Sequence, residues 1–320
     1  MEERLISLLR LAIKYNATDI HFLCIYQDVK IEMRIDNKFR AVKTKFEDYK
    51  LIRYLQYLSN LDVGNLLVPQ TGQFEMEVDN ILLSLRFAVI NNINYTNGVL
   101  RILNSNIKVD FNNLSSIEKQ NIYFRSLLKK NNGLVIFSGP TGSGKTTTVY
   151  SLLKGCRGKK IYTIEDPIEV YYDGFIQLQV NEALNFDYEH GIAQILRHDP
   201  DIIMIGEIRD FKAAKGAVDA ANTGHLVFTT LHATRASSCI SRLVSMGINE
   251  DQLYENLLCI SNQRMMIDKK SKDKIVLYEL MDRKEIEYYR KNKTNSEYFI
   301  DLESQIGNGI NENRFEKDTI

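Results

Sequence analysis

The stretch that most constrains the fold is GLVIFSGPTGSGKTT, residues 133–147. Its first half is an apolar run of strand length, and the residues from Gly139 to Thr146 satisfy the pattern G-x-x-x-x-G-K-[ST] in full. A buried strand, a glycine-rich turn and a helix in immediate succession predict one strand–helix unit of a parallel sheet.

Strands and helices continue to alternate after this unit. Predicted strands cover residues 160–166, 201–207 and 225–231, and predicted helices cover residues 145–154, 188–199 and 211–224. The strands are apolar throughout, which is typical of an α/β domain whose parallel sheet is covered on both faces. Residues 236–266 are predicted to add a pair of helices.

The chain before this domain has another pattern. An amphipathic first helix is followed by short strands with a turn at Asn37, by a helix that ends at Gly64, and by three more strands. Ser115 precedes Glu118 by three residues, which is the spacing of a capping box, and predicts a helix to about Lys130.

These patterns predict four segments. We expect a small α+β domain at 1–104, a polar linker at 105–113, a P-loop domain at 114–281 and a polar tail at 282–320. The tail is rich in Lys, Glu and Asn and is predicted to be a solvated helix that runs into a frayed end.

Composition excludes several classes of protein. Lys+Arg and Asp+Glu are both 41, so no bulk positive charge favours nucleic acid as a partner. The four cysteines are far apart in the sequence and form no C-x-x-C pair, which argues against a disulfide framework or a zinc ribbon and fits a reducing cytosol. The sequence contains no run of 18 apolar residues, so we expect no membrane span.

The glycine-rich turn has the residues that phosphate binding needs. Its glycines let backbone N–H groups approach phosphate oxygens, and the following helix adds partial positive charge at its N-terminus. Lys145 is expected to reach the β- and γ-phosphates, and the Thr146 hydroxyl to bind Mg²⁺. The candidate nucleotide-binding residues are Gly139, Pro140, Thr141, Gly142, Ser143, Gly144, Lys145, Thr146 and Thr147.

Acidic residues follow two of the predicted strands. Glu207 ends the run DIIMIGE, and the segment TIEDPIE places Glu165, Asp166 and Glu169 after another strand. Because parallel strands bring ligands to their carboxyl ends, one of these carboxylates could hold a Mg²⁺-bound water or accept a proton from the attacking water. A single acidic residue there would more simply be a surface charge or a helix cap, but two clusters favour a site.

Two histidines flank the run LVFTTL. His225 and His232 are an odd number of residues apart, so on a strand they point to opposite faces and lie about 23 Å apart, too far to share a metal ion. His232 is predicted at the carboxyl end, where it could hydrogen-bond a γ-phosphate or a carboxylate. A packed or capping histidine remains the alternative.

The order of the motifs resembles one family. GPTGSGKTT, TIEDPIE, LRHDPDIIMIGEIRD, TGHLVFTTLHA, RLVSMGI and NQRM follow one another as they do in the secretion ATPases of type II secretion, type IV pili and competence systems. The resemblance covers about residues 15–267. It implies a RecA-like P-loop NTPase core with a parallel-rich sheet, preceded by a small PAS-like α+β domain.

The resemblance also implies residue roles. Residues 139–147 are the Walker A loop, Asp166 and Glu169 belong to the Asp box with Glu169 as general base, and Glu207 is the Walker B acid that shares Mg²⁺ with Thr146, partly through water. His225 and His232 form the His box. The matching arginines are Arg86, Arg101, Arg197 and Arg209. Many members carry a further arginine where this chain has Ala193, so the arginine set departs from the family pattern.

The implied function is a Mg²⁺-dependent ATPase that forms homo-hexamers at the cytoplasmic face of the membrane. It would act on a polytopic platform protein, and through it on pseudopilins, with no direct nucleic-acid contact. Because no cysteine follows Cys259, the zinc insert of some branches is absent, and the chain most resembles the competence pseudopilus branch. Pilus retraction and type II secretion remain alternatives, and a DNA-translocating ATPase or a nucleotide-binding scaffold would belong to other classes.

Overall fold

The computed structural model describes residues 1–35, 38–64, 68–92, 94–103, 111–172, 174–181, 184–271 and 273–315. The predicted turn at Asn37 and most of the predicted linker lie outside these ranges. The chain divides into two compact units, of which unit 1 is Met1–Asn106 with Glu169–Tyr172, and unit 2 is Ile107–Ile168 with Asp173–Ile320.

Unit 1 is a helix-covered antiparallel sheet. Its elements are α1 (Glu2–Lys14), β1 (Asp19–Ile25), β2 (Asp28–Ile35), β3 (Lys38–Val42), η1 (Phe46–Tyr49), α2 (Lys50–Leu58), β4 (Gln70–Val78), β5 (Ile81–Asn91) and β6 (Thr96–Leu103). The strands are ordered β3-β2-β1-β6-β5-β4, and every neighbouring pair is antiparallel. The predicted α+β domain is confirmed.

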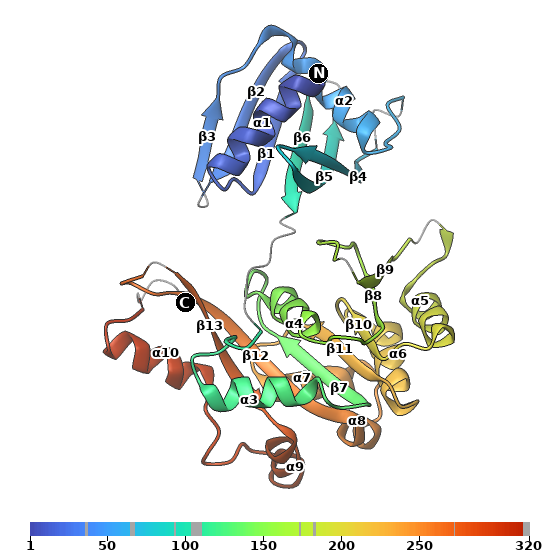
Figure 1. The fold of residues 1–320 in the computed structure, drawn as a ribbon, viewed down its shortest axis with the longest axis vertical. Coiled ribbons are helices and arrows are strands. Elements are labelled where there is room, and N and C mark those ends of the chain that lie inside the picture. The colour runs from blue at the N-terminus through green and yellow to red at the C-terminus, as the bar shows by residue number, and fades with distance from the viewer. Residues whose placement is uncertain are drawn as a thin grey trace. The chain divides into compact units, whose positions relative to one another are not determined.

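Both helices of unit 1 cover the same face of that sheet (Figure 1). Leu5, Leu8 and Leu9 recur at helical spacing along α1 and are almost fully buried. They pack against alternate strand residues such as Phe22 and Phe87. The remaining strand positions, including the two arginines that the sequence singles out, therefore lie on the opposite face of the sheet.

Unit 2 contains the predicted strand–helix alternation. Its elements are α3 (Glu118–Leu127), β7 (Gly133–Ser138), α4 (Lys145–Lys154), β8 (Ile161–Glu165), β9 (Phe175–Gln179), α5 (Tyr188–Ile195), η3 (Leu196–His198), β10 (Ile202–Ile205), α6 (Phe211–Asn222), β11 (Leu226–Leu231), α7 (Ala236–Ser245), α8 (Glu250–Asn256), β12 (Leu257–Ile267), β13 (Lys274–Met281), α9 (Arg283–Asn292) and α10 (Leu302–Asn311). The strand order is β13-β12-β7-β11-β10-β8-β9.

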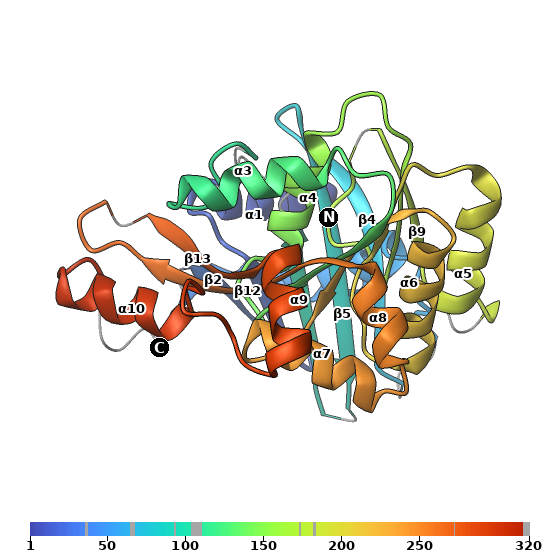
Figure 2. The same ribbon diagram turned by 90° about the horizontal axis from the view of Figure 1, so that it is seen from below.

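All neighbouring strands of this sheet are parallel except β12 and β13. Every residue of β7, β8, β10 and β11 is buried, because helices cover both faces. Figure 2 shows α3 and α4 on one side of the sheet and α7 and α8 on the other. The predicted α/β fold with a parallel-rich sheet is confirmed.

The prediction for residues 236–266 is half wrong. The chain forms α7 and α8 as expected, but residues 257–267 form the buried strand β12 beside β7. Ser261, Asn262 and Gln263 are fully buried in the middle of this strand. Because three consecutive polar residues interrupt the apolar pattern, the sequence does not predict a buried strand here. The edge strand β9 was also not anticipated.

Two smaller predictions also fail. Helix α3 begins at Glu118 with Ile117 at its N-cap, and the Ser115 hydroxyl accepts a hydrogen bond from the Ile117 N–H, so no capping box forms. The described part of the tail contains two helices. Helix α10 packs against Met266 and Leu277, and Phe315 is buried in the same cluster, so this part of the chain is neither frayed nor merely solvated.

None of the helices in the described ranges could span a lipid bilayer.

Candidate functional site

The turn between β7 and α4 has the backbone geometry of a phosphate-binding loop. Gly139 has φ of 144° and Gly144 has φ of 86°, a region that favours glycine. A Cβ atom on Gly139 would lie 2.5 Å from the Gln263 carbonyl oxygen, so close packing also requires glycine there. Gly144 is the N-cap of α4, which leaves the first N–H groups of that helix available at the loop.

Lys145 begins α4 and its side chain lies back across this loop. The Lys145 ammonium donates to the carbonyl oxygens of Gly139 and Pro140 at 3.0 and 3.1 Å. The side chain is 9% exposed, so the cation sits inside the loop. Thr146 and Thr147, at the same helix end, are half-buried. A glycine-rich turn, a helix N-terminus and an enclosed cation together fit a polyphosphate.

The buried strand β12 is hydrogen-bonded to the glycine-rich loop and to the segments beside it. The Gln263 side-chain amide donates to the Ser143 carbonyl at 2.6 Å. The Asn262 amide donates to the Ser138 hydroxyl and to the Ala233 carbonyl, both at 2.9 Å. β12 therefore holds the loop and the segment after β11 in one arrangement. Sequence reasoning missed these roles, although the motif NQRM pointed to the residues.

A polar network joins the carboxyl ends of three strands. His232 Nε2 lies 3.0 Å from Glu207 Oε1, and the Arg209 guanidinium donates to Glu207 Oε2 at 3.0 Å. The same arginine reaches Asp166 at 3.4 Å. The hydrogen bond from Arg209 to Glu207 is the largest cause of a raised pKa for that guanidinium. We call Asp166, Arg209, Glu207 and His232 the strand-end network.

The topology explains why these four residues meet. β8, β10 and β11 are adjacent and parallel, so their carboxyl ends lie at one edge of the sheet. Asp166 directly follows β8, Glu207 follows β10 by two residues, and His232 directly follows β11. The Glu207 side chain is 20% exposed, so its two oxygens are engaged by His232 and Arg209 in partial shelter from water.

Glu165, the last residue of β8, has a different environment. Its carboxylate is buried and accepts hydrogen bonds from the Tyr150 hydroxyl, the Thr163 hydroxyl at 2.7 Å and the Gln177 amide at 3.3 Å. Burial, followed by the Glu165 charge, raises the pKa of Tyr150, which keeps the phenol a donor. This carboxylate ties α4 and β9 to β8 and so positions the strand end that carries Asp166.

Three predicted site residues of the chain's second half lie outside the network. Glu169 is exposed in an irregular segment, groups with unit 1, and forms no hydrogen bond or ion pair within the described ranges. Arg197 is exposed in η3 and makes no such contact there either. His225 precedes β11 at its other end, where its Nδ1 lies 3.1 Å from the Thr223 hydroxyl.

The two remaining arginines belong to unit 1. Arg86 of β5 and Arg101 of β6 are directly paired across the sheet, so both occupy the face that the helices leave open. Arg101 donates to buried Asp19 at 2.7 Å. Burial alone would raise the pKa of the Asp19 carboxyl, but hydrogen bonds from Arg101 and Thr18 outweigh it and hold that pKa below its ordinary value.

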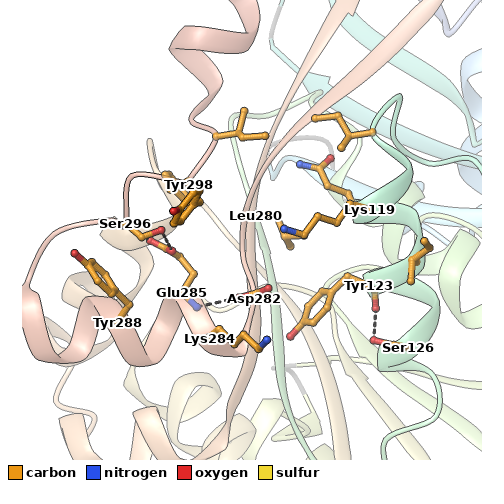
Figure 3. Close-up of a pocket in the computed structure, with 15 residues that line it drawn as sticks. Lys119, Tyr123, Ser126, Leu280, Asp282, Lys284, Glu285, Tyr288, Ser296 and Tyr298 are labelled. Carbon is orange, nitrogen blue, oxygen red and sulfur yellow. Dashed lines mark hydrogen bonds between the residues drawn. The ribbon is translucent and has the colours of Figure 1, made fainter.

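A cavity lies away from these residues. It has a volume of about 530 Å³ and lies between α3, the end of β13, α9 and the segment at 296–300. Figure 3 shows the side chains that line it. Its walls are mainly apolar and aromatic, and Glu285 in it is held by the Ser296 backbone and hydroxyl at 2.8 and 2.6 Å. No residue of the glycine-rich loop or the strand-end network lines it.

Comparison with known proteins identifies a matching family model and several similar sequences. The family model described as "Type II/IV secretion system protein" matches residues 1–300. The chain is 39% identical over 256 residues to the competence protein ComGA of Bacillus subtilis, covering 78% of this chain and 72% of that protein. It is 35% identical over 260 residues to the type II secretion system ATPase E of Vibrio cholerae, covering 80% of this chain but only 52% of that protein.

Solved structures agree in fold. The chain is similar to the pilus retraction motor PilT with bound ADP at a TM-score of 0.70 and 26% identity, covering 98% of this chain and 91% of that one. It is similar to the ATPase DotB of Legionella pneumophila at a TM-score of 0.75, where 18% identity shows the fold alone. With a family model across most of its length and a 39% identical relative, the chain belongs to the type II/IV secretion system protein family.

Proposed function

We propose that this protein is an ATPase that converts ATP hydrolysis into mechanical work in the assembly of a pseudopilus or pilus for DNA uptake. The observation that carries the proposal is the combination, within unit 2, of the Lys145 loop with the strand-end network. The similarity to ComGA favours competence among the uses of this family. The bound ADP in the similar PilT structure supports the nucleotide assignment.

Binding of ATP would use the loop between β7 and α4. Residues 139–147 provide backbone N–H groups and a helix N-terminus, and Lys145 would exchange the Gly139 and Pro140 carbonyls for phosphate oxygens. That exchange replaces neutral acceptors with charged ones, so the lysine binds more strongly when triphosphate is present. Arg86 and Arg101 are proposed to add positive charge from unit 1.

Mg²⁺ fits the donor set at this site. The Thr146 hydroxyl and the Glu207 carboxylate are oxygen donors of the kind that Mg²⁺ prefers, with water and phosphate completing the set. When bound, the ion would neutralise charge that develops on the phosphate oxygens. Within the described ranges no three acidic, histidine or cysteine side chains gather into a closed cation site, which fits an ion held partly by water and substrate.

Side chains of this site would activate the attacking water and respond to loss of the γ-phosphate. Glu169 is proposed as the general base that takes the water proton, and Glu207 with Asp166 as the carboxylates that orient the site. His232 bonds to Glu207, so a change in charge at that carboxylate reaches the segment after β11 directly. His232 is therefore proposed to sense the γ-phosphate and His225 to serve the ring interface, and Arg197 is proposed to act near the nucleotide, as the family resemblance implies.

The working form is proposed to be a homo-hexamer at the inner face of the cell membrane, in contact with a polytopic platform protein. Pilus retraction is the second candidate, because the similarity to PilT covers 98% of this chain. A deletion strain separates the two. Loss of DNA uptake with normal twitching supports the competence role, and loss of twitching alone would overturn it in favour of retraction.

The enzymatic part is tested with the purified chain. We expect ATP turnover that requires Mg²⁺ and rises with protein concentration as rings form. Phosphate production by a malachite-green assay, followed beside the mass of the assembly by light scattering, measures both. Absence of turnover in the assembled ring with Mg²⁺ present would contradict the proposal and favour a nucleotide-binding scaffold.

A further inference from the structure

An open pocket of about 710 Å³ borders the candidate nucleotide site within unit 2. Its walls come from the start of the glycine-rich loop, the segment after β11, one side of α7 and the middle of β12. The lining residues are Gly139, Pro140, His232, Ala233, Thr234, Ser238, Ser241, Arg242, Ser245 and Arg264. The function proposed above uses Gly139, Pro140 and His232 but assigns no role to the serines and arginines of α7 and β12 that complete the walls.

The pocket is positively charged. Arg242 and Arg264 line it, whereas none of the described residues that line it is acidic. Among the described residues, Arg264 donates to neutral acceptors only, namely the Asn262 side-chain oxygen at 3.1 Å and the backbone oxygens of Gln263 and Thr234 at 3.2 and 3.5 Å. Arg242 is exposed, and in the part of the chain that the structure describes neither arginine forms an ion pair.

Hydroxyl groups lie beside these cations. Ser238, Ser241 and Ser245 follow one another at spacings of three and four, so they share one side of α7 with Arg242. The Ser245 hydroxyl donates to the Arg242 backbone oxygen at 2.7 Å, so the hydroxyl donors considered for an anion are those of Ser238 and Ser241. Hydroxyls and guanidinium groups on one wall bind oxyanions, because each can donate to a different oxygen of the same anion. Arginine also suits phosphate through two parallel N–H donors.

The pocket is linked to both halves of the nucleotide site. Gly139 and Pro140 line it and are the two residues whose carbonyl oxygens hold Lys145. His232 also lines it and bonds to Glu207, the proposed Walker B acid. An anion released between Lys145 and Glu207 therefore meets this positive pocket immediately beyond Pro140 and His232.

We propose that this pocket receives the inorganic phosphate produced by ATP hydrolysis and is its route away from the glycine-rich loop. The proposal rests on the ATPase function proposed above. The ligand is a free dianionic phosphate, which leaves when ADP is still bound. Its passage places a negative charge beside α7 after each turnover, next to the His232 segment that senses the nucleotide.

The first test is phosphate binding to the ADP-loaded full-length chain at constant ionic strength, followed by isothermal titration calorimetry. We expect Arg242→Ala to weaken inorganic phosphate binding at least about tenfold, because a direct guanidinium contact is lost. Arg157→Ala, an exposed arginine between α4 and β8, is the matched control and should bind phosphate as the parent does. Thermal melting checks that Arg242→Ala is folded.

Lys145→Ala decides where the phosphate sits. If phosphate binding to ADP-loaded protein falls with Lys145→Ala and not with Arg242→Ala, the anion occupies the former γ-position and the proposal fails. ADP occupancy is measured first and only ADP-saturated samples are compared, because Lys145 is itself expected to bind the β-phosphate. If phosphate binding falls with Arg242→Ala and stays within about twofold in Lys145→Ala, the pocket is the binding site. An equal fall in both variants would overturn the pocket as a separate site.

The second test separates cleavage from release in single turnovers. Quenched-flow measurement gives the rate of ATP cleavage, and a fluorescent phosphate-binding protein gives the rate of release. We expect Arg242→Ala to slow release several-fold relative to cleavage, with Arg157→Ala unchanged. Equal slowing of both steps would place Arg242 in the chemistry and overturn the exit role. Failure of the parent to cleave ATP would instead overturn the proposed function while leaving the anion site intact.

Discussion

The two units use their sheets in opposite ways. The sheet of unit 2 is parallel at its centre and buried on both faces, so its polar residues gather where strands end. The sheet of unit 1 is antiparallel and covered by helices on one face, so its polar residues line the other face along the strands. Polar side chains are therefore concentrated at one edge of the sheet in unit 2 and spread over one face of the sheet in unit 1.

This difference suggests a catalytic role for unit 2 and a supporting role for unit 1. The strand-end network is held by contacts within unit 2, and Lys145 donates to two carbonyl oxygens of the same unit. Arg101 is held by Asp19 on the open face of unit 1. We therefore expect substitutions at the strand ends of unit 2 to remove activity, and substitutions on the open face of unit 1 to reduce it.

The largest effect is expected for Lys145→Ala. ATP turnover should fall at least about a thousandfold, because the enclosed cation next to the phosphates is lost. Steady-state phosphate release measures it, and Lys119→Ala on α3, an exposed lysine, is the control that should keep parental turnover. Parental turnover in Lys145→Ala would show that this loop is not the catalytic site.

The next effect is expected for Glu207→Gln. The amide keeps the shape of the side chain but removes the charge that binds Arg209 and His232, so turnover should fall about a hundredfold while ATP is still bound. Binding of a fluorescent ATP analogue and turnover are measured on the same sample. Loss of binding equal to the loss of turnover would mean that Glu207 supports the fold of the site and not the reaction.

A smaller effect is expected in unit 1. Arg101→Ala should lower turnover about tenfold, equivalent to about 1.4 kcal/mol of activation free energy, because one of the positive charges proposed to act on the phosphates is lost. Lys30→Ala, on the same sheet, is the control. A loss of turnover as large as that of Lys145→Ala would contradict the proposed difference between the units, because it would mean that unit 1 contributes directly to ATP hydrolysis.

The smallest effect concerns the stability of unit 1 and its dependence on pH. The pKa of Asp19 is held below its ordinary value, so its contribution to the free energy of unfolding is present above about pH 4 and is lost as pH falls through the folded-state pKa. Asp19→Asn should be less stable than the parent near pH 6, and the difference should shrink below about pH 4. Urea unfolding at several pH values measures it, and a constant difference would exclude the ion pair as its cause.

The sequence was sufficient to predict the fold class and the loop at residues 139–147, because buried parallel strands and glycine turns leave local patterns. It also located Glu207 and His232 correctly at strand ends. The sequence did not predict which of these side chains contact one another. The contact from Arg209 to Asp166 spans 43 residues, and only the order of β8, β10 and β11 in the sheet brings the two together.

β12 shows why the remainder could not be predicted. Its polar centre is unlike that of a typical buried strand, because the side chains there have partners elsewhere in the chain. Asn262 donates to the Ser138 hydroxyl at the end of β7 and to the Ala233 carbonyl, and Gln263 donates to the Ser143 carbonyl. Polar residues are stable in a core when such partners satisfy them, and a pattern of single residues does not contain that information. The role predicted for Glu169 rests on the family resemblance alone. The hydrogen bonds and ion pairs of the described residues neither hold Glu169 nor place it beside Lys145.

The support of the loop by β12 also has a consequence for synthesis. On the ribosome, β7 and the glycine-rich turn emerge early, but Gln263 emerges 120 residues after the Ser143 carbonyl that it binds. Until then β7 lacks its neighbour on one side and stays an unpaired edge in the nascent chain. The nucleotide loop is therefore among the first parts of unit 2 to be made and among the last to be finished.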